Sequence, residues 1–245
     1  MKQKQLFSAI LLLCACMISP KVQAQLELGI SGGYVRNNLN TSTLYRSFTK
    51  YEGQNSFTVG IPVRYNFKDW LAVQAEVIYI RKDYKKSRSY YYEGIYQKTE
   101  NSYIKLPLMA HFSFGGNKLR GFTNIGGYAA YWANSRVKGV TASLNYNANI
   151  PEGNYLQFYE PYFYDEKNPF DSRRDNRIEW GLLAGIGAEY AVTGILKLFI
   201  EGRYYYGTTD LQKDYMINKV PRYNDTFTIQ MGALLNLSSI LGHNK

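Results

Sequence analysis

Alternation of large apolar and polar residues is the clearest pattern in this chain. Between positions 57 and 67 every second residue is large and apolar, and the residues between them are polar or small. A period of two is typical of a β-strand whose two faces have different surroundings. A soluble strand that is half-buried in a core shows the same pattern, so one segment does not identify the surroundings. The apolar set is Phe57, Val59, Ile61, Val63, Tyr65 and Phe67, and the set between them is Thr58, Gly60, Pro62, Arg64 and Asn66.

Similar segments recur almost to the end of the chain. Each has about the ten residues that a tilted strand needs to cross a bilayer. The fifth segment is rich in glycine, and we consider a bulge at Gly126 and Gly127 that would switch its two faces. The predicted strands are Leu26–Arg36, Ser56–Phe67, Leu71–Arg81, Ser102–Phe114, Arg120–Trp132, Arg177–Tyr190, Ile195–Tyr206 and Thr226–Leu237.

The connections between these segments alternate between short and long. Outer-membrane barrels have short periplasmic turns and long extracellular loops, and an even number of strands leaves both termini in the periplasm. The same arrangement is expected here. The short connections are 68–70, 115–119 and 191–194, and the long ones are 37–55, 82–101, 133–176 and 207–225.

Charged residues opposite the apolar sets distinguish a membrane barrel from a soluble barrel of the lipocalin type. A soluble barrel would bury the apolar face and leave the charges outside, and charges turned inward would disrupt its core. Inside a membrane barrel the same groups pair with one another. We therefore predict an all-β, transmembrane, antiparallel up-and-down barrel of about eight strands. The charges expected inside are Arg64, Lys105, Lys197, Arg203, Glu76, Glu179, Glu189 and Glu201.

Aromatic residues gather near the predicted strand ends, as expected for the two interfacial girdles of such a barrel. The chain has 24 tyrosines. The turn-side set is Tyr65, Phe67, Trp70, Phe112, Phe114 and Tyr190, and the loop-side set is Tyr79, Trp132, Trp180, Tyr204 and Tyr206.

The N-terminus predicts a cleaved signal peptide over residues 1–24, followed by one barrel domain over residues 25–245. Basic residues precede a short apolar stretch, and Ala24 closes a small-residue cleavage site. A membrane anchor is less favoured because the apolar stretch is too short and ends at Pro20. A lipoprotein signal with Cys16 as the lipidated residue is a further alternative. Ordinary cleavage removes Cys14 and Cys16 and excludes thiol chemistry from the mature chain.

The formal net charge of +10 is the next informative property. Such an excess could indicate a nucleic-acid partner, but an exported chain rarely meets one, and the basic residues are scattered among tyrosines and acids. We therefore expect the cationic side chains to contact outer-membrane lipid and lipopolysaccharide phosphates, and we expect no nucleic-acid partner.

Three motifs, in order along the chain, resemble those of the PorT-like outer-membrane β-barrel family of Bacteroidota. The segment 103–108 (YIKLPL) is similar to that family's proline-containing strand, 180–190 to its glycine-rich strand, and 201–207 (EGRYYYG) to its E-x-R-Y-x-x-G strand. The resemblance implies the barrel fold and an outer-membrane location. Because the name-giving member belongs to a type-nine secretion and gliding system, it also implies a role in the cell envelope or in protein secretion. One departure is that the last predicted strand ends near Leu237 and not on an aromatic residue.

One arrangement could carry catalysis. His111 and Ser113 share a face of a predicted strand, as in the His-x-Ser pair of lipid A deacylase barrels, and Glu189 or Glu179 could orient the histidine. The alternative is an interior histidine that is bonded to a neighbour, and we favour it because the alternation turns His111 inward. We therefore predict no catalytic, cofactor-binding or metal-binding residues. Loop acids are interspersed with basic residues, which favours a solvated surface (Asp165, Glu166, Asp171 and Asp175).

The long loops are the best candidates for a functional surface, because binding residues are commonly carried by loops on a rigid scaffold. The loop 133–176 is rich in aromatic residues, which either recognise a partner or pack onto the barrel mouth. An eight-stranded interior is just filled by side chains, so a small-solute channel is not favoured. We predict a non-enzymatic scaffold of the envelope or of protein secretion whose outer loops bind a partner. The loop aromatics are Tyr146, Tyr155, Phe158, Tyr159, Tyr162, Phe163, Tyr164 and Phe170.

Overall fold

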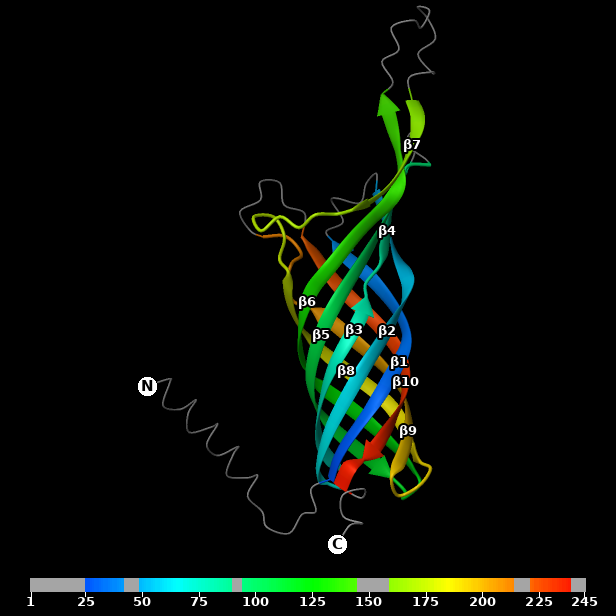
Figure 1. Cartoon of the computed structure of the whole chain (residues 1–245), viewed down its shortest axis with the longest axis vertical. Coiled ribbons are helices and arrows are strands. Elements are labelled where there is room, and N and C mark those ends of the chain that lie inside the picture. Colours follow the sequence, from blue (N-terminus) through cyan, green and yellow to red (C-terminus); the bar gives the residue numbers. More distant parts are fainter. Residues whose placement is uncertain (1–24, 42–48, 90–93, 145–158, 214–220, 239–245) are drawn as a thin grey trace, which may run out of the picture.

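The computed structural model describes residues 25–41, 49–89, 94–144, 159–213 and 221–238. The predicted signal peptide therefore lies outside the described residues. Ten strands are present in the described part of the chain, and they form one antiparallel sheet (Figure 1). They are β1 (Gln25–Thr41), β2 (Thr49–Lys68), β3 (Leu71–Arg81), β4 (Tyr84–Arg88), β5 (Tyr96–Gly115), β6 (Leu119–Leu144), β7 (Tyr159–Lys167), β8 (Ile178–Ala191), β9 (Leu196–Gly207) and β10 (Arg222–Asn236).

The sheet closes into a cylinder. Pairing runs from β1 through β2, β3, β5, β6, β8 and β9 to β10, and β10 pairs with β1 again. These are the eight predicted strands, so the predicted antiparallel barrel is confirmed. The strand predicted over Leu71–Arg81 is found with the same bounds. The last strand ends at Asn236, in regular register with both neighbours.

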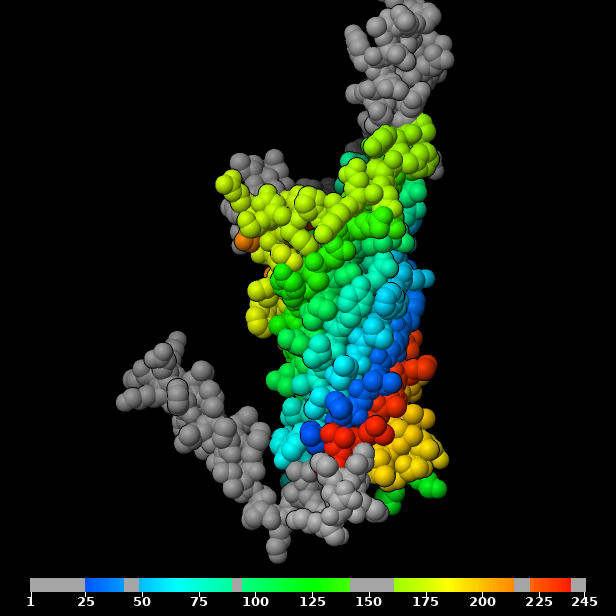
Figure 2. Space-filling view, viewed as in Figure 1, coloured from blue at the N-terminus to red at the C-terminus, as the bar shows by residue number. Residues whose placement is uncertain are grey.

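The regular structure continues into all four of the predicted long loops, and two of these loops contain an additional strand. β4 continues the line of β3 and pairs with both β2 and β5. β6 has 26 residues, and its outer part leaves β8 and pairs with β7. Apolar alternation reports the lipid-facing part of a strand only, so the polar outer parts of these strands gave no such signal. Figures 1 and 2 show β7 rising clear of the barrel.

The bulge considered at Gly126 and Gly127 is wrong. Both glycines keep an uninterrupted register with β5 and with β8. The irregularity lies further out, where Ser102 pairs with Asn134 and Tyr103 pairs with Trp132, which leaves Ala133 without a partner on β5. An extra residue switches the faces of a strand at that point.

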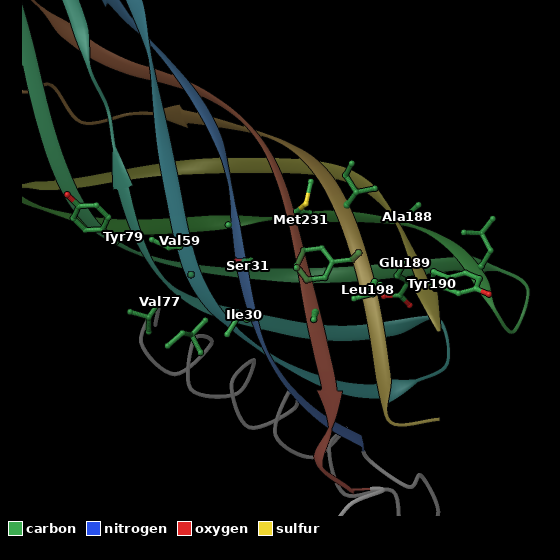
Figure 3. A pocket seen from close by; sticks show the side chains of 18 of the residues that line it. Ile30, Ser31, Val59, Val77, Tyr79, Ala188, Glu189, Tyr190, Leu198 and Met231 are labelled. Carbon is green, nitrogen blue, oxygen red and sulfur yellow. The ribbon is translucent and has the colours of Figure 1, made fainter. Parts of the chain in front are cut away.

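The outer wall of the cylinder is apolar, as predicted. Ile30 is 70% exposed, Met231 65% and Leu182 62%, and they belong to three different strands. Figure 3 shows the residues that line a pocket at this wall, and they include aliphatic side chains of several strands, such as Val59, Val77 and Leu198. Exposed apolar surface of this extent is expected where acyl chains cover the wall. No helix of the described residues has the length and apolar character needed to span a bilayer.

The predicted aromatic girdles are largely confirmed. Tyr65, Trp70 and Phe114 are exposed at the turn end, and Trp180 and Tyr206 are exposed toward the loop end. Trp132, which was predicted to belong to the loop-side girdle, does not lie on the outer wall.

The side chain of Trp132 is buried inside the barrel, where its ring stacks on Tyr103 at 5.8 Å between centroids. Even positions of β6 face inward up to the irregularity at Ala133, and Trp132 is the last of them. The predicted strand ended at Trp132, so this residue was assigned to the interfacial girdle and its inward orientation was not predicted.

The apolar wall gives a stability prediction. Ile200→Lys places a charge in the aliphatic band of β9, and we expect it to lower the free energy of unfolding by about 2–4 kcal/mol. Tyr206→Lys, nearer the outer interface on the same face, is the matched control and should cost at most about 1 kcal/mol. Urea unfolding in lipid vesicles, followed by tryptophan fluorescence, measures both. Equal costs for the two variants would contradict the placement of the lipid-facing band.

Candidate functional site: the barrel interior and its outer rim

Ion pairs cross the barrel from wall to wall. Arg64 of β2 lies 2.6 Å from Glu189 of β8, measured from Nη1 to Oε2. β2 and β8 are four strands apart in either direction around the closed sheet, so they face each other across the axis. Arg64 also lies 3.5 Å from Glu27, which in turn accepts a hydrogen bond of 2.6 Å from Lys197.

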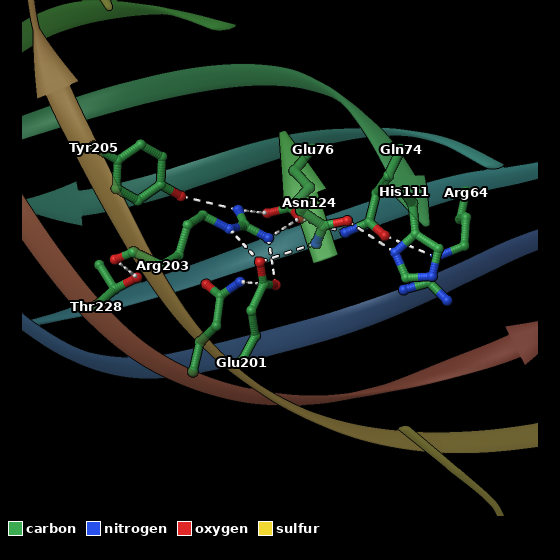
Figure 4. A network of polar contacts seen from close by, with 10 residues as sticks. Arg64, Gln74, Glu76, His111, Asn124, Glu201, Arg203, Tyr205 and Thr228 are labelled. Carbon is green, nitrogen blue, oxygen red and sulfur yellow. Dashed lines mark hydrogen bonds and ion pairs between the residues drawn. The ribbon is translucent and has the colours of Figure 1, made fainter. Parts of the chain in front are cut away.

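A second cross-axis pair lies further along the barrel. Arg203 of β9 donates to Glu76 of the opposite strand β3 at 2.8 Å and to Glu201 at 2.6 Å (Figure 4). Arg203 and Glu76 are both almost completely buried. Gln74 links the two layers, because it accepts a hydrogen bond from Arg64 Nε at 2.8 Å and donates to Glu76 at 2.6 Å.

A third layer lies toward the loop end and surrounds Glu179. Its carboxylate accepts hydrogen bonds from Lys82, from Tyr128 at 2.7 Å and from Asn224 at 2.7 Å. Lys82 is fully buried although it follows the end of β3. Lys82 was not among the predicted inward charges because its position was assigned to a loop, and Glu27 was not among them because the first strand was recognised by its small inward residues. All eight of the predicted inward charges do face the interior.

Lys105 is held differently from the other interior charges. Its side chain is fully buried, and its Nζ has no hydrogen-bond partner among the described residues. Nζ lies 3.4 Å from the ring centroid of Tyr205 and 4.4 Å from that of Tyr128. Aromatic faces attract a cation in this geometry and partly replace its lost hydration.

The interior also contains an apolar part, in addition to the predicted charges. An apolar and aromatic cluster occupies the loop-end part of the lumen. Phe170 packs against it from the rim, and its ring centroid lies 5.0 Å from that of Trp132. The pattern carried a signal, since Ile78 and Ile80 interrupt the polar face of β3. The buried members are Val35, Leu39, Ile78, Ile80, Tyr103, Met109, Tyr128, Ala130, Trp132, Leu183, Tyr205 and Leu211.

His111 and Ser113 contact two separate groups. His111 Nδ1 lies 2.8 Å from Asn124 Oδ1, and Ser113 Oγ donates to the backbone oxygen of Asp69 at 2.8 Å. Glu189 is bound to Arg64, and the described residues show no hydrogen bond that joins it to His111. His111 therefore has the arrangement that we favoured, an interior histidine bonded to a neighbour. Within the described residues no group of three or more histidine, cysteine or acidic side chains is placed to hold a metal ion.

The outer rim carries the exposed chemistry. β7 and the outer part of β6 form a two-stranded ribbon that projects beyond the barrel, which we call the rim ribbon (Arg136–Leu144 with Tyr159–Lys167). Tyr162 is 54% exposed and Phe163 is 71% exposed. At the base of the rim ribbon Arg136 forms two hydrogen bonds with Asp165, at 2.6 and 2.9 Å.

Glu100 ties the rim ribbon to the barrel on the neighbouring strand β5. Its carboxylate lies 3.2 Å from Arg81 and 3.4 Å from Lys138. Burial raises the pKa of Glu100, but the charges of Arg81 and Lys138 outweigh this and hold the pKa below its ordinary value. Glu100 therefore stays ionised at neutral pH and keeps both contacts.

The cross-axis pairs predict a large effect on stability. Arg203→Met leaves Glu76 and Glu201 buried without their cation, and we expect a loss of about 3–5 kcal/mol in the free energy of unfolding. The combined variant Arg203→Met, Glu76→Gln and Glu201→Gln removes the uncompensated charges and should recover most of that loss. Urea unfolding in vesicles measures both. A combined variant no more stable than Arg203→Met would disprove the charge-pairing explanation.

Comparisons with solved structures agree with the barrel fold. The outer membrane protease OmpT from Escherichia coli is similar over 89% of this chain and 99% of its own, with 10% identity and a TM-score of 0.51. OprG from Pseudomonas aeruginosa covers 85% of this chain and 94% of its own, with 12% identity and a TM-score of 0.45. Neisserial surface protein A covers 85% and 96%, with 13% identity and a TM-score of 0.42.

At these identities the likeness concerns the fold alone. Comparison with curated protein sequences finds no match. The sequence model described as "Outer membrane protein beta-barrel domain" matches residues 20–213, which is most of the chain. The closed antiparallel cylinder, its apolar outer wall and this match lead to one conclusion: the chain belongs to the outer membrane protein β-barrel domain family and resides in the outer membrane.

Proposed function

We propose that this protein is a non-enzymatic scaffold of the outer membrane that binds a partner protein at its outer rim. The observation that carries the proposal is the cross-axis pairing of Arg64 with Glu189 and of Arg203 with Glu76. These pairs occupy the lumen, as expected for a barrel of this size. In a barrel of eight strands, side chains that meet across the axis leave no room beside them for a continuous aqueous path. The loop end of the barrel, which faces the outside of the cell, is then the surface that remains available for recognition.

The rim ribbon is the best-suited part of that surface. Tyr162 and Phe163 are exposed side by side in sequence and therefore lie on opposite faces of β7. Aromatic residues are enriched in the buried centres of protein interfaces, and a stiff support lowers the entropic cost of binding. The bidentate Arg136–Asp165 pair supplies such a support at the base. Phe170, in contrast, packs onto the barrel mouth, so the two interpretations of the loop aromatics apply to different residues.

The resemblance to the PorT-like barrels supports a partner within the cell envelope. That resemblance rests on the segments 103–108, 180–190 and 201–207, all of which lie in the barrel wall. The signal peptide over residues 1–24 is part of the same proposal, because it delivers the chain for export. We propose an envelope or secretion-associated partner for this reason. Comparing the secreted proteins of a deletion strain with those of the parent tests the secretion role.

The rim ribbon gives a binding prediction. Tyr162→Ser with Phe163→Ser removes both exposed aromatics, and we expect recovery of the partner by cross-linking and co-purification from the native envelope to fall by about tenfold or more. The matched control is Glu166→Ser with Lys167→Ser, two residues of the same strand that are also exposed. It should retain the partner within about twofold. Unchanged recovery with the aromatic variant would reject the rim ribbon as the binding surface.

The filled lumen gives a functional prediction that separates the scaffold from its alternatives. We expect the purified barrel to show no single-channel conductance in planar bilayers in which a porin conducts. We also expect His111→Ala to leave the acyl-chain content of lipid A unchanged, because the hydroxyl of Ser113 donates to the backbone oxygen of Asp69 and not to His111. Discrete openings would support a channel, and altered lipid A acylation would support a hydrolase. Either result would overturn the proposed scaffold.

A further inference from the structure

Three basic side chains face the inside of the barrel mouth. Tyr84 packs against the interior cluster, and alternation along β4 places Lys86 and Arg88 on the same face as Tyr84. Arg222 begins β10 two residues before Asn224, which is 1% exposed, so Arg222 shares its inward face. We call Lys86, Arg88 and Arg222 the mouth cluster.

None of the three has an ionic partner in the part of the chain that the structure describes. The ion pairs found there involve other cations. Arg88 donates to the hydroxyl of Thr49 at 3.0 Å. The Nε of Arg222 is buried and has no hydrogen-bond partner among the described residues, and the nearby Asp210 accepts from the backbone N–H of Arg222 at 3.2 Å.

Several cations on the outward face of the same region do have charged or aromatic partners. Lys98 and Lys138 both lie within 3.5 Å of Glu100. Lys85, the outward neighbour of Lys86, lies over the ring of Tyr96 at 4.9 Å from its centroid. On the outward face Lys98 and Lys138 thus share an acidic partner, whereas the described residues offer no ionic partner to Lys86, Arg88 or Arg222.

The members of the mouth cluster are close enough to act on one another. Burial lowers the pKa of Lys86, and the positive charges of Arg88 and Arg222 lower it further. Arg222 also acts on Tyr84, where it opposes the increase in pKa that burial causes. The register places these cations at the same end of the barrel, because Arg222 pairs with Thr41 at the end of β1 and Arg88 pairs with Thr49 at the start of β2.

We propose that the mouth cluster binds a phosphate or sulfate group of a soluble ligand that enters the barrel from outside the cell. Two guanidinium groups and an ammonium group are the donors that suit a tetrahedral oxyanion, and arginine adds paired N–H donors. The ligand reaches no further, since the layer of Lys82 and Glu179 closes the lumen below. A phospholipid or lipopolysaccharide headgroup shares this chemistry, but the cluster faces the axis and not the lipid-covered wall.

Binding is tested on the full chain refolded in detergent, with inorganic pyrophosphate as the probe in isothermal titration calorimetry. We expect Lys86→Gln with Arg222→Gln to weaken pyrophosphate binding by about tenfold or more. The matched control, Lys85→Gln with Lys98→Gln, removes the same charge from the outward face of β4 and β5. It should change the affinity by no more than about twofold.

Heat-modifiable gel mobility confirms that each variant is folded. Because the substitutions in the mouth cluster remove like-charge repulsion, we expect that variant to be no less heat-stable than the parent without pyrophosphate. Pyrophosphate should raise the unfolding temperature of the parent and of the control, but not that of the mouth-cluster variant.

Several outcomes would overturn the proposal. Absence of pyrophosphate binding to the parent rejects the site, and equal weakening in the control variant shows general attraction to a basic protein. Competition by lipopolysaccharide in nanodiscs would assign the cluster to a lipid headgroup, whereas the proposal expects none. The variant Tyr162→Ser with Phe163→Ser should bind pyrophosphate normally, so failure of the rim-ribbon proposal and failure of this one are distinguishable.

Discussion

Charge neutralisation across the barrel axis is the interaction on which the rest of this structure depends. Arg64 and Arg203 are almost fully buried, and each finds its carboxylate on the opposite wall. A buried charge without a partner costs several kcal/mol, so neither wall can turn its charges inward alone. The pairs therefore stabilise the closed cylinder and fix which strands face each other.

The wall, the lumen and the rim of the barrel lie in three different environments. The wall faces acyl chains and is aliphatic, the lumen is filled by ion pairs and aromatic rings, and the rim meets water at the loop end. The rim itself has two chemically different parts. Exposed aromatics lie on the rim ribbon, and three cations for which the described residues offer no ionic partner lie inside the mouth. A protein partner and a soluble anion would thus meet separate surfaces of the same rigid support.

The sequence predicted the wall well and the rim poorly. Strict alternation over Leu71–Arg81 gave a strand with the bounds that the structure shows, because lipid imposes an apolar residue at every outward position. Outside the bilayer this constraint is absent, so the outer part of β6 and all of β7 gave no pattern. Trp132 was misplaced because aromatics occur both at the interfaces and in the lumen, and a single unpaired residue, Ala133, ends the regular alternation.

By itself the sequence determined the fold class, the number of strands in the wall, and the side of each strand on which charges lie, because a period of two sorts residues by face. Only the tertiary structure decided which charges meet. Partners such as Arg64 and Glu189 are 125 positions apart, and their contact depends on the closure and shear of the whole sheet. The same closure gathered Lys86, Arg88 and Arg222 at one mouth. A local pattern cannot encode distances across an axis that exists only once the first and last strands have paired.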